Sequence, residues 1–310
     1  MTRKPFYRRL LATTLLLPAM AMAEPSTWPD GSQLVISFSM QVEAGGQPEG
    51  AESPFSASPV DKGFPDLPAT SWFAYGYKEG VQRMLKLWDE NQIKVTSHIV
   101  GEVAQKHPEM VKAIAEGGHE IAAHGMRWAS SYNLPYDEEK AFIGDGVDAV
   151  EKVTGQRAVG FNANWMRRSP NTLKVLQDLN FTYHIDDLSR DEPFVTLVRG
   201  KKFAVVPYTL RNNDIVLIEG RHFSADQFYE QLTLEFDRLY AEGATRRRMM
   251  SVSLHDRIGG TPAVVAAVDR FIHYAKGHPR VAFMRKDQIA QIVLTEKDPL
   301  IDTSEAQWND

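Results

Sequence analysis

The sequence predicts a single α/β domain built on a mostly parallel sheet or barrel. Between residues 34 and 294, apolar and β-branched runs of strand length alternate with longer segments of helical periodicity at least six times. Such alternation is typical of folds in which each strand is followed by a helix. The chain has 310 residues, 43% hydrophobic and 24% charged, so one soluble domain with a large core is expected.

The expected strands are short apolar runs, and the expected helices lie between them. The strands span residues 34–39, 95–99, 119–123, 158–161, 203–206, 215–218, 249–254 and 281–284. The helices span residues 77–91, 108–116, 137–154, 169–179, 224–242, 261–276 and 287–294, with capping signals at Ser169-Pro170, Ser224 with Gln227, and Thr261-Pro262. Residues 44–70 predict a long surface loop, and the polar residues after Lys297 predict a loose tail.

The first 23 residues have the pattern of a secretory signal peptide. Their basic start is followed by a short apolar run over 10–20 and by Ala21-Met22-Ala23, which fits a cleavage site. The run is too short to span a bilayer, although an uncleaved anchor is the alternative. The pattern predicts export to the periplasm or the medium, and Arg8-Arg9 raises a twin-arginine route beside the general one. We therefore divide the chain into a signal peptide (1–23), a domain (24–296) and a tail (297–310).

Charge and cysteine content exclude several classes of partner and site. Without the four basic residues of the signal peptide, 31 basic residues face 40 acidic ones, a net charge near −9. This balance argues against a polyanionic partner such as nucleic acid. The absence of cysteine excludes a thiolate zinc site and a thiol nucleophile, and an exported domain without disulfides must rely on its core. The sequence leaves the oligomeric state open, a homo-oligomer included.

Ionisable side chains follow several expected strands, at the end where parallel α/β folds bind their ligands. Glu43 follows the first strand beside a glycine pair, His124 ends GHEIAAHG, and His255 ends SLH. A histidine titrates near neutrality and suits acid–base chemistry. A solvated glutamate and buried structural histidines are the alternatives. Polar residues that follow other expected strands are Arg167, Asp186, Tyr208 and Asp214.

GHEIAAHG and SLH, in this order, resemble the second and fifth motifs of the polysaccharide deacetylase (NodB-homology) family, over residues 34–294. The resemblance implies an irregular (β/α)7-type barrel and metal-assisted hydrolysis of an acetamido group on a sugar. The family's metal is normally held by an Asp after the first strand and by two histidines spaced i, i+4. Here residues 39–41 (SMQ) follow Phe38, and Trp128 stands four residues after His124. One histidine cannot hold Zn²⁺, which takes three protein ligands.

A more specific resemblance is to the family's allantoinase-like branch, which opens a cyclic ureide and is reported as not needing the metal. It rests on Glu43 before Gly45-Gly46, on Tyr75-Gly76, and on HEIAAHGMRW, SPNT, VPYTLRNND and SLHDR. Carried over, it implies Glu43, His124 and His255 as catalytic residues, without a cofactor, zinc being the alternative. It implies that the substrate is lined by Trp128, Arg167, Asp186, Tyr208 and Asp214. Two departures are export and the longer segment 162–168 (NANWMRR).

The sequence therefore predicts an exported hydrolase of a non-peptide carbon–nitrogen bond in a cyclic ureide, amide or acetamido group. The substrate would be a small molecule or a glycan. Glu43 or His124 would activate water, His255 would protonate the leaving nitrogen, and backbone N–H groups or Arg167 would stabilise the oxyanion. Two alternatives stay open: a metal-dependent deacetylase of envelope glycans, and a non-catalytic binding protein that kept the barrel.

Overall fold

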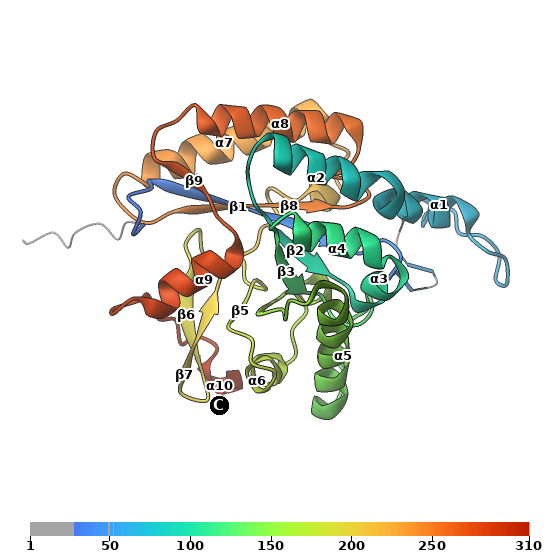
Figure 1. Cartoon of the computed structure of the whole chain (residues 1–310), viewed down its shortest axis with the longest axis horizontal. Helices are drawn as coiled ribbons and strands as arrows, with labels where there is room; N and C mark the ends of the chain where they lie inside the picture. The colour runs from blue at the N-terminus through green and yellow to red at the C-terminus, as the bar shows by residue number, and fades with distance from the viewer. Residues whose placement is uncertain (1–27, 49, 52, 310) are drawn as a thin grey trace, which may run out of the picture.

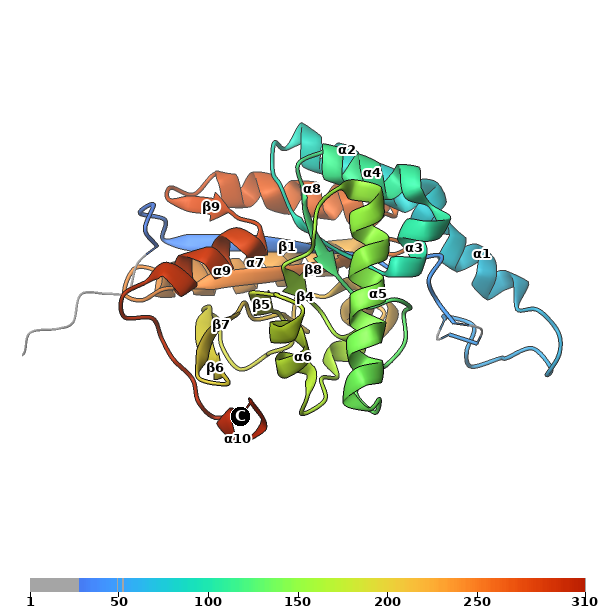
Figure 2. The same cartoon turned by 60° about the horizontal axis from the view of Figure 1, so that its bottom comes forward.

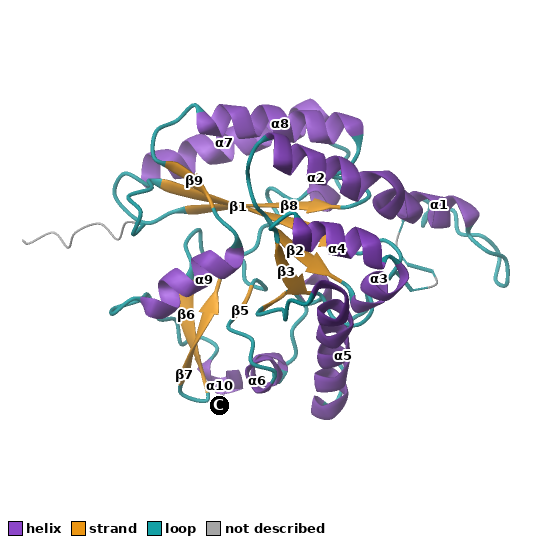
Figure 3. Cartoon of the chain, viewed as in Figure 1, coloured by secondary structure: helices purple, strands orange, loops and turns teal. Residues whose placement is uncertain are grey.

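The computed structural model describes residues 28–48, 50–51 and 53–309, so the predicted signal peptide lies outside the described residues. A curled sheet forms the centre of the molecule, with helices packed around it (Figure 1, Figure 3). The strands are β1 (Leu34–Val42), β2 (Thr96–Ile99), β3 (Glu120–Ala123), β4 (Gly160–Phe161), β5 (Tyr183–His184), β6 (Phe194–Val198), β7 (Lys201–Val205), β8 (Met249–His255) and β9 (Val281–Phe283).

The strand order is β6-β7-β5-β4-β3-β2-β1-β8, with β9 beside β1. The paired strands of the described chain run parallel, apart from the antiparallel pair β6 and β7. Residues 206–213 pass between β5 and β8, where Val206 N–H donates to His184 O (3.0 Å) and Ser253 N–H donates to Asn212 O (3.0 Å). This sheet is an irregular, incompletely closed barrel, which confirms the predicted fold class.

The helices lie outside the curled sheet (Figure 1, Figure 2). They are α1 (Leu67–Tyr75), α2 (Val81–Glu90), α3 (Gly101–Lys106), α4 (Pro108–Glu116), α5 (Tyr136–Thr154), α6 (Thr172–Asp178), α7 (Ala225–Glu242), α8 (Pro262–Lys276), α9 (Lys286–Thr295) and α10 (Ala306–Asn309). In both views α7 and α8 run side by side along β1 and β8, and α5 covers the side of β3. Within the described residues, no helix combines the length and apolarity needed to cross a membrane.

The alternation of side chains along β1 explains how the site is positioned. Leu34, Ile36, Phe38, Met40 and Val42 belong to the main core, where the Phe38 ring lies 5.1 Å from that of Trp88. The residues between them face the inside of the curled sheet and become polar toward the strand's end: Ser37, Ser39, Gln41 and Glu43. Met40, one of the residues that follow Phe38 where the family normally carries its Asp ligand, therefore points into the core. Gln41 is the inward-facing residue there.

The prediction of a strand over residues 215–218 is wrong. Ile215–Glu219 forms a π-helical turn in which Gly220 N–H donates to Ile215 O (2.9 Å). The preceding side chains start it, because Asp214 Oδ1 accepts from Ile215 N–H at 2.8 Å and Asn213 Oδ1 accepts from the same group at 3.1 Å. Local capping by Asn and Asp outweighs the β-propensity of an apolar run.

Other differences concern short elements and the tail. β6 and β7 form a hairpin whose two-residue turn, Arg199-Gly200, has positive φ at both residues (47° and 72°). The sequence analysis did not predict this turn. Helix α6 has Asn171 rather than Ser169 at its N-cap position, without a capping hydrogen bond from the Asn171 side chain. The tail is not loose: Val195 N–H donates to Leu300 O (2.8 Å), and Arg199 N–H donates to Asn309 O (3.0 Å).

Candidate active site

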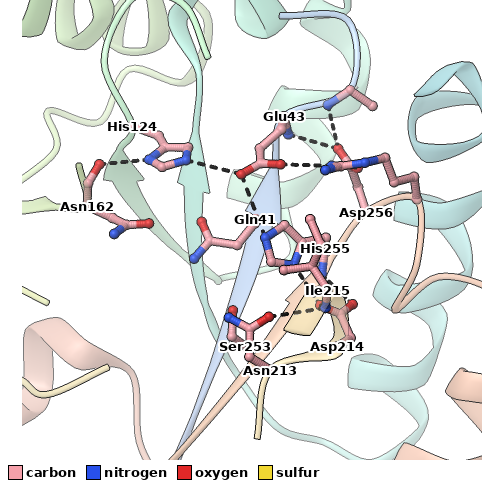
Figure 4. Close-up of polar contacts among 12 residues, drawn as sticks. Gln41, Glu43, His124, Asn162, Asn213, Asp214, Ile215, Ser253, His255 and Asp256 are labelled. Carbon is pink, nitrogen blue, oxygen red and sulfur yellow. Dashed lines mark hydrogen bonds and ion pairs between the residues drawn. The ribbon is translucent and has the colours of Figure 1, made fainter. Parts of the chain in front are cut away.

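The carboxyl ends of β1, β3, β4 and β8 meet around a small pocket of about 40 Å³ (Figure 4). It brings together five residues predicted from the sequence: Glu43, His124, Trp128, Tyr208 and His255. Its other lining residues are Gln41, Asn162, Ala163, Trp165, Met166, Leu210, Asn213, Ile215 and Val216. Residues that follow different strands in the sequence therefore line one pocket, as expected for the carboxyl ends of parallel strands.

Glu43 is the centre of the pocket. Its Oε1 lies 3.2 Å from His124 Nε2 and 3.8 Å from His255 Nε2. Its Oε2 accepts from Arg257 Nη1 at 2.8 Å, so the two oxygens serve opposite sides (Figure 4). Burial alone would raise the pKa of Glu43, but the charges of His255 and Arg257 hold that pKa well below its ordinary value. Glu43 is thus an ionised carboxylate in a buried setting.

Arg257 is a cation enclosed by aromatic rings. Its guanidinium carbon lies 4.9 Å from the ring centres of Trp72 and Trp128 and 5.1 Å from that of Phe73. The side chain is fully buried, which is tolerable because Glu43 pairs with it and the ring faces attract a cation. Trp128 therefore holds the guanidinium as well as lining the pocket.

Asp256 fixes the backbone that carries Glu43. Its Oδ2 accepts from Glu43 N–H and Ala44 N–H, both at 2.8 Å. The segment after β1 is thereby held against the turn that follows β8. Neither Asp256 nor Arg257 was among the predicted site residues.

His124 has a defined tautomer. Its Nδ1 lies 2.7 Å from Asn162 O, and because a carbonyl oxygen only accepts, Nδ1 carries the hydrogen. Nε2 then faces the Glu43 carboxylate. A hydrogen bond between these two atoms needs one further proton, on Nε2.

Asp214 positions His255 through two hydrogen bonds. Asp214 Oδ1 accepts from His255 Nδ1 at 2.6 Å, and Oδ2 accepts from His255 N–H at 2.7 Å. Burial lowers the pKa of His255, but the charges of Asp214 and Glu43 outweigh burial and raise it above its ordinary value. His255 is therefore suited to donate a proton from Nε2 into the pocket.

Tyr208 lines the pocket and is held by a network of polar side chains. Its hydroxyl accepts from Gln41 Nε2 (3.0 Å) and Asn213 Nδ2 (3.2 Å) and contacts Ser253 Oγ. Burial raises the pKa of Tyr208, so the hydroxyl stays neutral. Among these partners, Gln41 stands two residues before Glu43. Because side chains alternate along a strand, both point to the inside of the sheet, and this spacing is visible in the sequence.

The other predicted residues lie near the pocket or away from it. Asp186 holds two pocket-lining residues in place, since its Oδ1 accepts from Asn162 Nδ2 (2.7 Å) and Ala163 N–H (3.0 Å). Burial raises the pKa of Asp186 to about 6. Arg167 does not line this pocket. It lines a neighbouring cavity with Tyr132, Arg168 and Glu305, so its predicted oxyanion role lacks support.

Two comparisons place this geometry in a family. The family model described as polysaccharide deacetylase matches residues 65–184. The crystal structure of a probable polysaccharide deacetylase from Pseudomonas aeruginosa PAO1 is 32% identical, over 87% of this chain and 94% of that one, with a TM-score of 0.81. The chain belongs to the polysaccharide deacetylase family. As a member of this family, it is a hydrolase that acts on carbon–nitrogen bonds other than peptide bonds.

Two further relatives match nearly the same share of this chain. The crystal structure of PuuE allantoinase is also 32% identical, over 90% of this chain and 97% of that one, with a TM-score of 0.80. A polysaccharide deacetylase homologue of Schizosaccharomyces pombe is 28% identical over 296 residues, 86% of this chain and 92% of its own length. The family and enzyme class predicted from the sequence are confirmed. The chain is 32% identical both to a probable deacetylase and to an allantoinase, so these comparisons do not decide between their substrates.

The metal that the family implies does not fit this donor set. In the part of the chain that the structure describes, no group of three or more His, Cys, Asp or Glu side chains could hold a metal ion. Trp128 offers no ligand atom, and Arg257 already gives Glu43 a positive partner. His255 Nδ1 donates to Asp214, so only its Nε2 is left to act as a ligand.

The electrostatic support of His255 gives a direct prediction. Replacing Asp214 with Asn keeps a hydrogen-bond acceptor but removes the negative charge, so the titration midpoint of His255 should move to lower pH. NMR of labelled histidine measures that midpoint, which in the wild type should lie above the ordinary value of 6.5. Asp226→Asn, on the exposed surface of α7, is the matched control and should leave the midpoint unchanged. A wild-type midpoint below 6.5 would contradict the assignment.

Proposed function

We propose that this protein hydrolyses a carbon–nitrogen bond of a cyclic ureide, amide or acetamido group with its own side chains and without a metal. The observation that carries the proposal is the position of Glu43. One of its oxygens faces both histidines, and the other is paired with the caged cation of Arg257. A fixed positive charge and an acid–base pair thus occupy the region in which the family otherwise uses a metal.

Each protein group has a role in the proposed reaction. A water oxygen attacks the carbonyl carbon while a proton of the water passes to the Glu43–His124 pair. The hydrogen on His124 Nδ1 stays there and is donated to Asn162 O. The carbon–nitrogen bond then breaks, and His255 gives its Nε2 proton to the leaving nitrogen. Asp214 stabilises the charged ring before that transfer. The products are the acid and the amine.

Export is part of the proposal. The basic start, apolar run and Ala21-Met22-Ala23 site support delivery to the periplasm or the medium, where a small molecule or a glycan would be the substrate. Cell fractionation tests this point. Recovery of the full-length chain in the cytoplasm would contradict it.

Turnover on a mixed panel tests the chemistry. The purified protein is incubated with a five-membered cyclic ureide, a simple amide and an N-acetylated sugar, and the released acid or amine is measured. We expect turnover of at least one of them, and a fall in kcat/KM of about 10²-fold or more in Glu43→Gln, because the negative charge that helps the Glu43–His124 pair accept the proton of water is then lost. Glu235→Gln, at a surface pair with Arg211, is the control. Tight binding without turnover would instead support a non-catalytic member of the fold.

A further inference from the structure

The proposed reaction creates a negative charge for which no partner has yet been assigned. When water adds to the carbonyl carbon, the electron pair of the C=O π bond moves onto the carbonyl oxygen, which becomes an anion. The Glu43–His124 pair takes the proton of the water and His255 serves the leaving nitrogen. Arg167 does not line the pocket. A different hydrogen-bond donor is therefore needed for this oxyanion.

Three side-chain amides line the catalytic pocket: Gln41, Asn162 and Asn213. Each amide nitrogen carries two hydrogens that it can donate. Asn162 Nδ2 donates to Asp186 Oδ1 (2.7 Å) and to Ala163 O (3.2 Å). Asn213 Nδ2 donates to a tyrosine hydroxyl (3.2 Å) and to a backbone carbonyl (3.4 Å). Both asparagines thus spend their two hydrogens on the protein itself.

Gln41 differs from the two asparagines. Its Nε2 donates to the Tyr208 hydroxyl at 3.0 Å and has no second acceptor within the described part of the chain. Its Oε1 is fully buried and lacks a hydrogen-bond partner among the same residues. The amide oxygen therefore does not face the accessible space of the pocket. The second N–H is the polar group that Gln41 can offer to a bound molecule.

The network around Tyr208 fixes the orientation of this amide. Asn213 Oδ1 accepts from Ile215 N–H at 3.1 Å, so its Nδ2 is the atom that faces the Tyr208 hydroxyl. That hydroxyl contacts Ser253 Oγ, which can accept its hydrogen, and Gln41 donates to the oxygen. Because an amide group is planar, this bond also fixes the direction of the second N–H. A donor held in advance needs no reorganisation during the reaction.

Gln41 lies between the groups that handle protons. It stands two residues before Glu43 on the inward face of β1 and is paired in register with His255 on β8. In the view of Figure 4 its amide lies between the rings of His124 and His255. The pocket has a volume of only about 40 Å³, so a carbonyl group bound among these residues lies close to the Gln41 amide.

We infer that Gln41 is a further catalytic residue, whose second N–H binds the carbonyl oxygen of the substrate and stabilises the oxyanion. Gln41 transfers no proton. When the tetrahedral adduct collapses, the electron pair on the oxygen forms the C=O bond again, the carbon–nitrogen bond breaks, and the nitrogen takes the proton of His255. The inference rests on the proposed function, because the reacting group is placed at Glu43.

Kinetics of two Gln41 variants test the assignment on the best substrate of the panel. Gln41→Met has a similar size but no donor, and we expect kcat to fall about 10²–10³-fold with KM nearly unchanged. Gln41→Glu keeps a partner for the Tyr208 hydroxyl but places negative charge at the oxyanion, so its loss should be at least as large. Gln105→Met, exposed on α3, is the control. An unchanged kcat, or a loss confined to KM, would overturn the assignment.

Binding of methylboronic acid separates the oxyanion donor from the chemistry. Its trigonal boron takes up the oxygen of a water, the Glu43–His124 pair takes the proton, and a small tetrahedral anion results without turnover. Boron NMR at a pH where the free acid is trigonal should show tetrahedral boron in the wild type. Affinity should fall about tenfold or more in Gln41→Met and stay unchanged in Gln105→Met.

This binding result would support the donor even if every amide and ureide of the panel is inert, in which case only the proposed function fails. No tetrahedral boron in the wild type, or equal affinity in the wild type and Gln41→Met, would overturn the role of Gln41.

Discussion

Replacing His255 with Ala is expected to lower kcat/KM by about 10²–10⁴-fold, the usual contribution of a positioned general acid. The leaving nitrogen then has no protein donor, since His255 Nε2 points into the pocket and its Nδ1 is held by Asp214 at 2.6 Å. Steady-state kinetics on the best substrate of the panel measures the loss. The loss should fall mainly on kcat, because the proton is transferred during bond cleavage.

The control for this variant is His273→Ala on the exposed side of α8, which should retain wild-type kinetics. A leaving group that needs no proton, such as a nitrophenolate, should restore most of the turnover of His255→Ala. Wild-type kcat in His255→Ala would remove His255 from the reaction. An equal loss for all leaving groups would make it a structural residue.

Replacing Arg257 with Met is expected to lower the free energy of unfolding by about 3–5 kcal/mol, because it leaves the Glu43 carboxylate buried without its cation. Met fills similar space among Trp72, Phe73 and Trp128, so loss of charge rather than loss of volume dominates. Turnover should fall as well, since the pKa of Glu43 is held down partly by Arg257. Chemical denaturation and kinetics at several pH values measure the two effects.

Arg270 offers a matched control, because it also combines an ion pair with a cation–π contact. It pairs with Asp226 at 2.7 Å and lies 4.2 Å from the ring centre of Tyr229, but on the surface. Arg270→Met should cost less than about 1 kcal/mol. Equal stability changes in the two variants would contradict the account of Arg257. Restored stability in the double variant Arg257→Met/Glu43→Gln would support it.

Most of the fold could be predicted because strand-length apolar runs and helix caps carry local information. The Ser224–Gln227 capping box, for instance, begins α7 as expected. The errors arose where short-range contacts compete with a pattern. Ile215–Glu219 has a strand's composition but is turned by Asn213 and Asp214. The hairpin around Arg199-Gly200 depends on two left-handed residues, only one of which is a glycine.

The structure brings together those predicted residues that end a strand, and the sequence analysis missed the residues that support them. Strand-end position singled out Glu43, His124 and His255, and the family resemblance gave them their predicted catalytic roles. Arg257 was missed because its burial depends on rings from distant segments, although it stands two residues after His255. The part played by Asn162 could not be read from the sequence, because a backbone carbonyl, common to every residue, orients His124.

The most direct test of the central proposal is the activity of metal-free protein. The protein is dialysed against a strong chelator, its metal content is measured by elemental analysis, and kcat/KM is compared before and after added Zn²⁺. The caged Arg257 cation beside Glu43 predicts unchanged activity in the metal-free protein and no gain from zinc. Loss of activity on chelation, restored by one equivalent of Zn²⁺ per chain, would contradict it and favour a metal-dependent deacetylase.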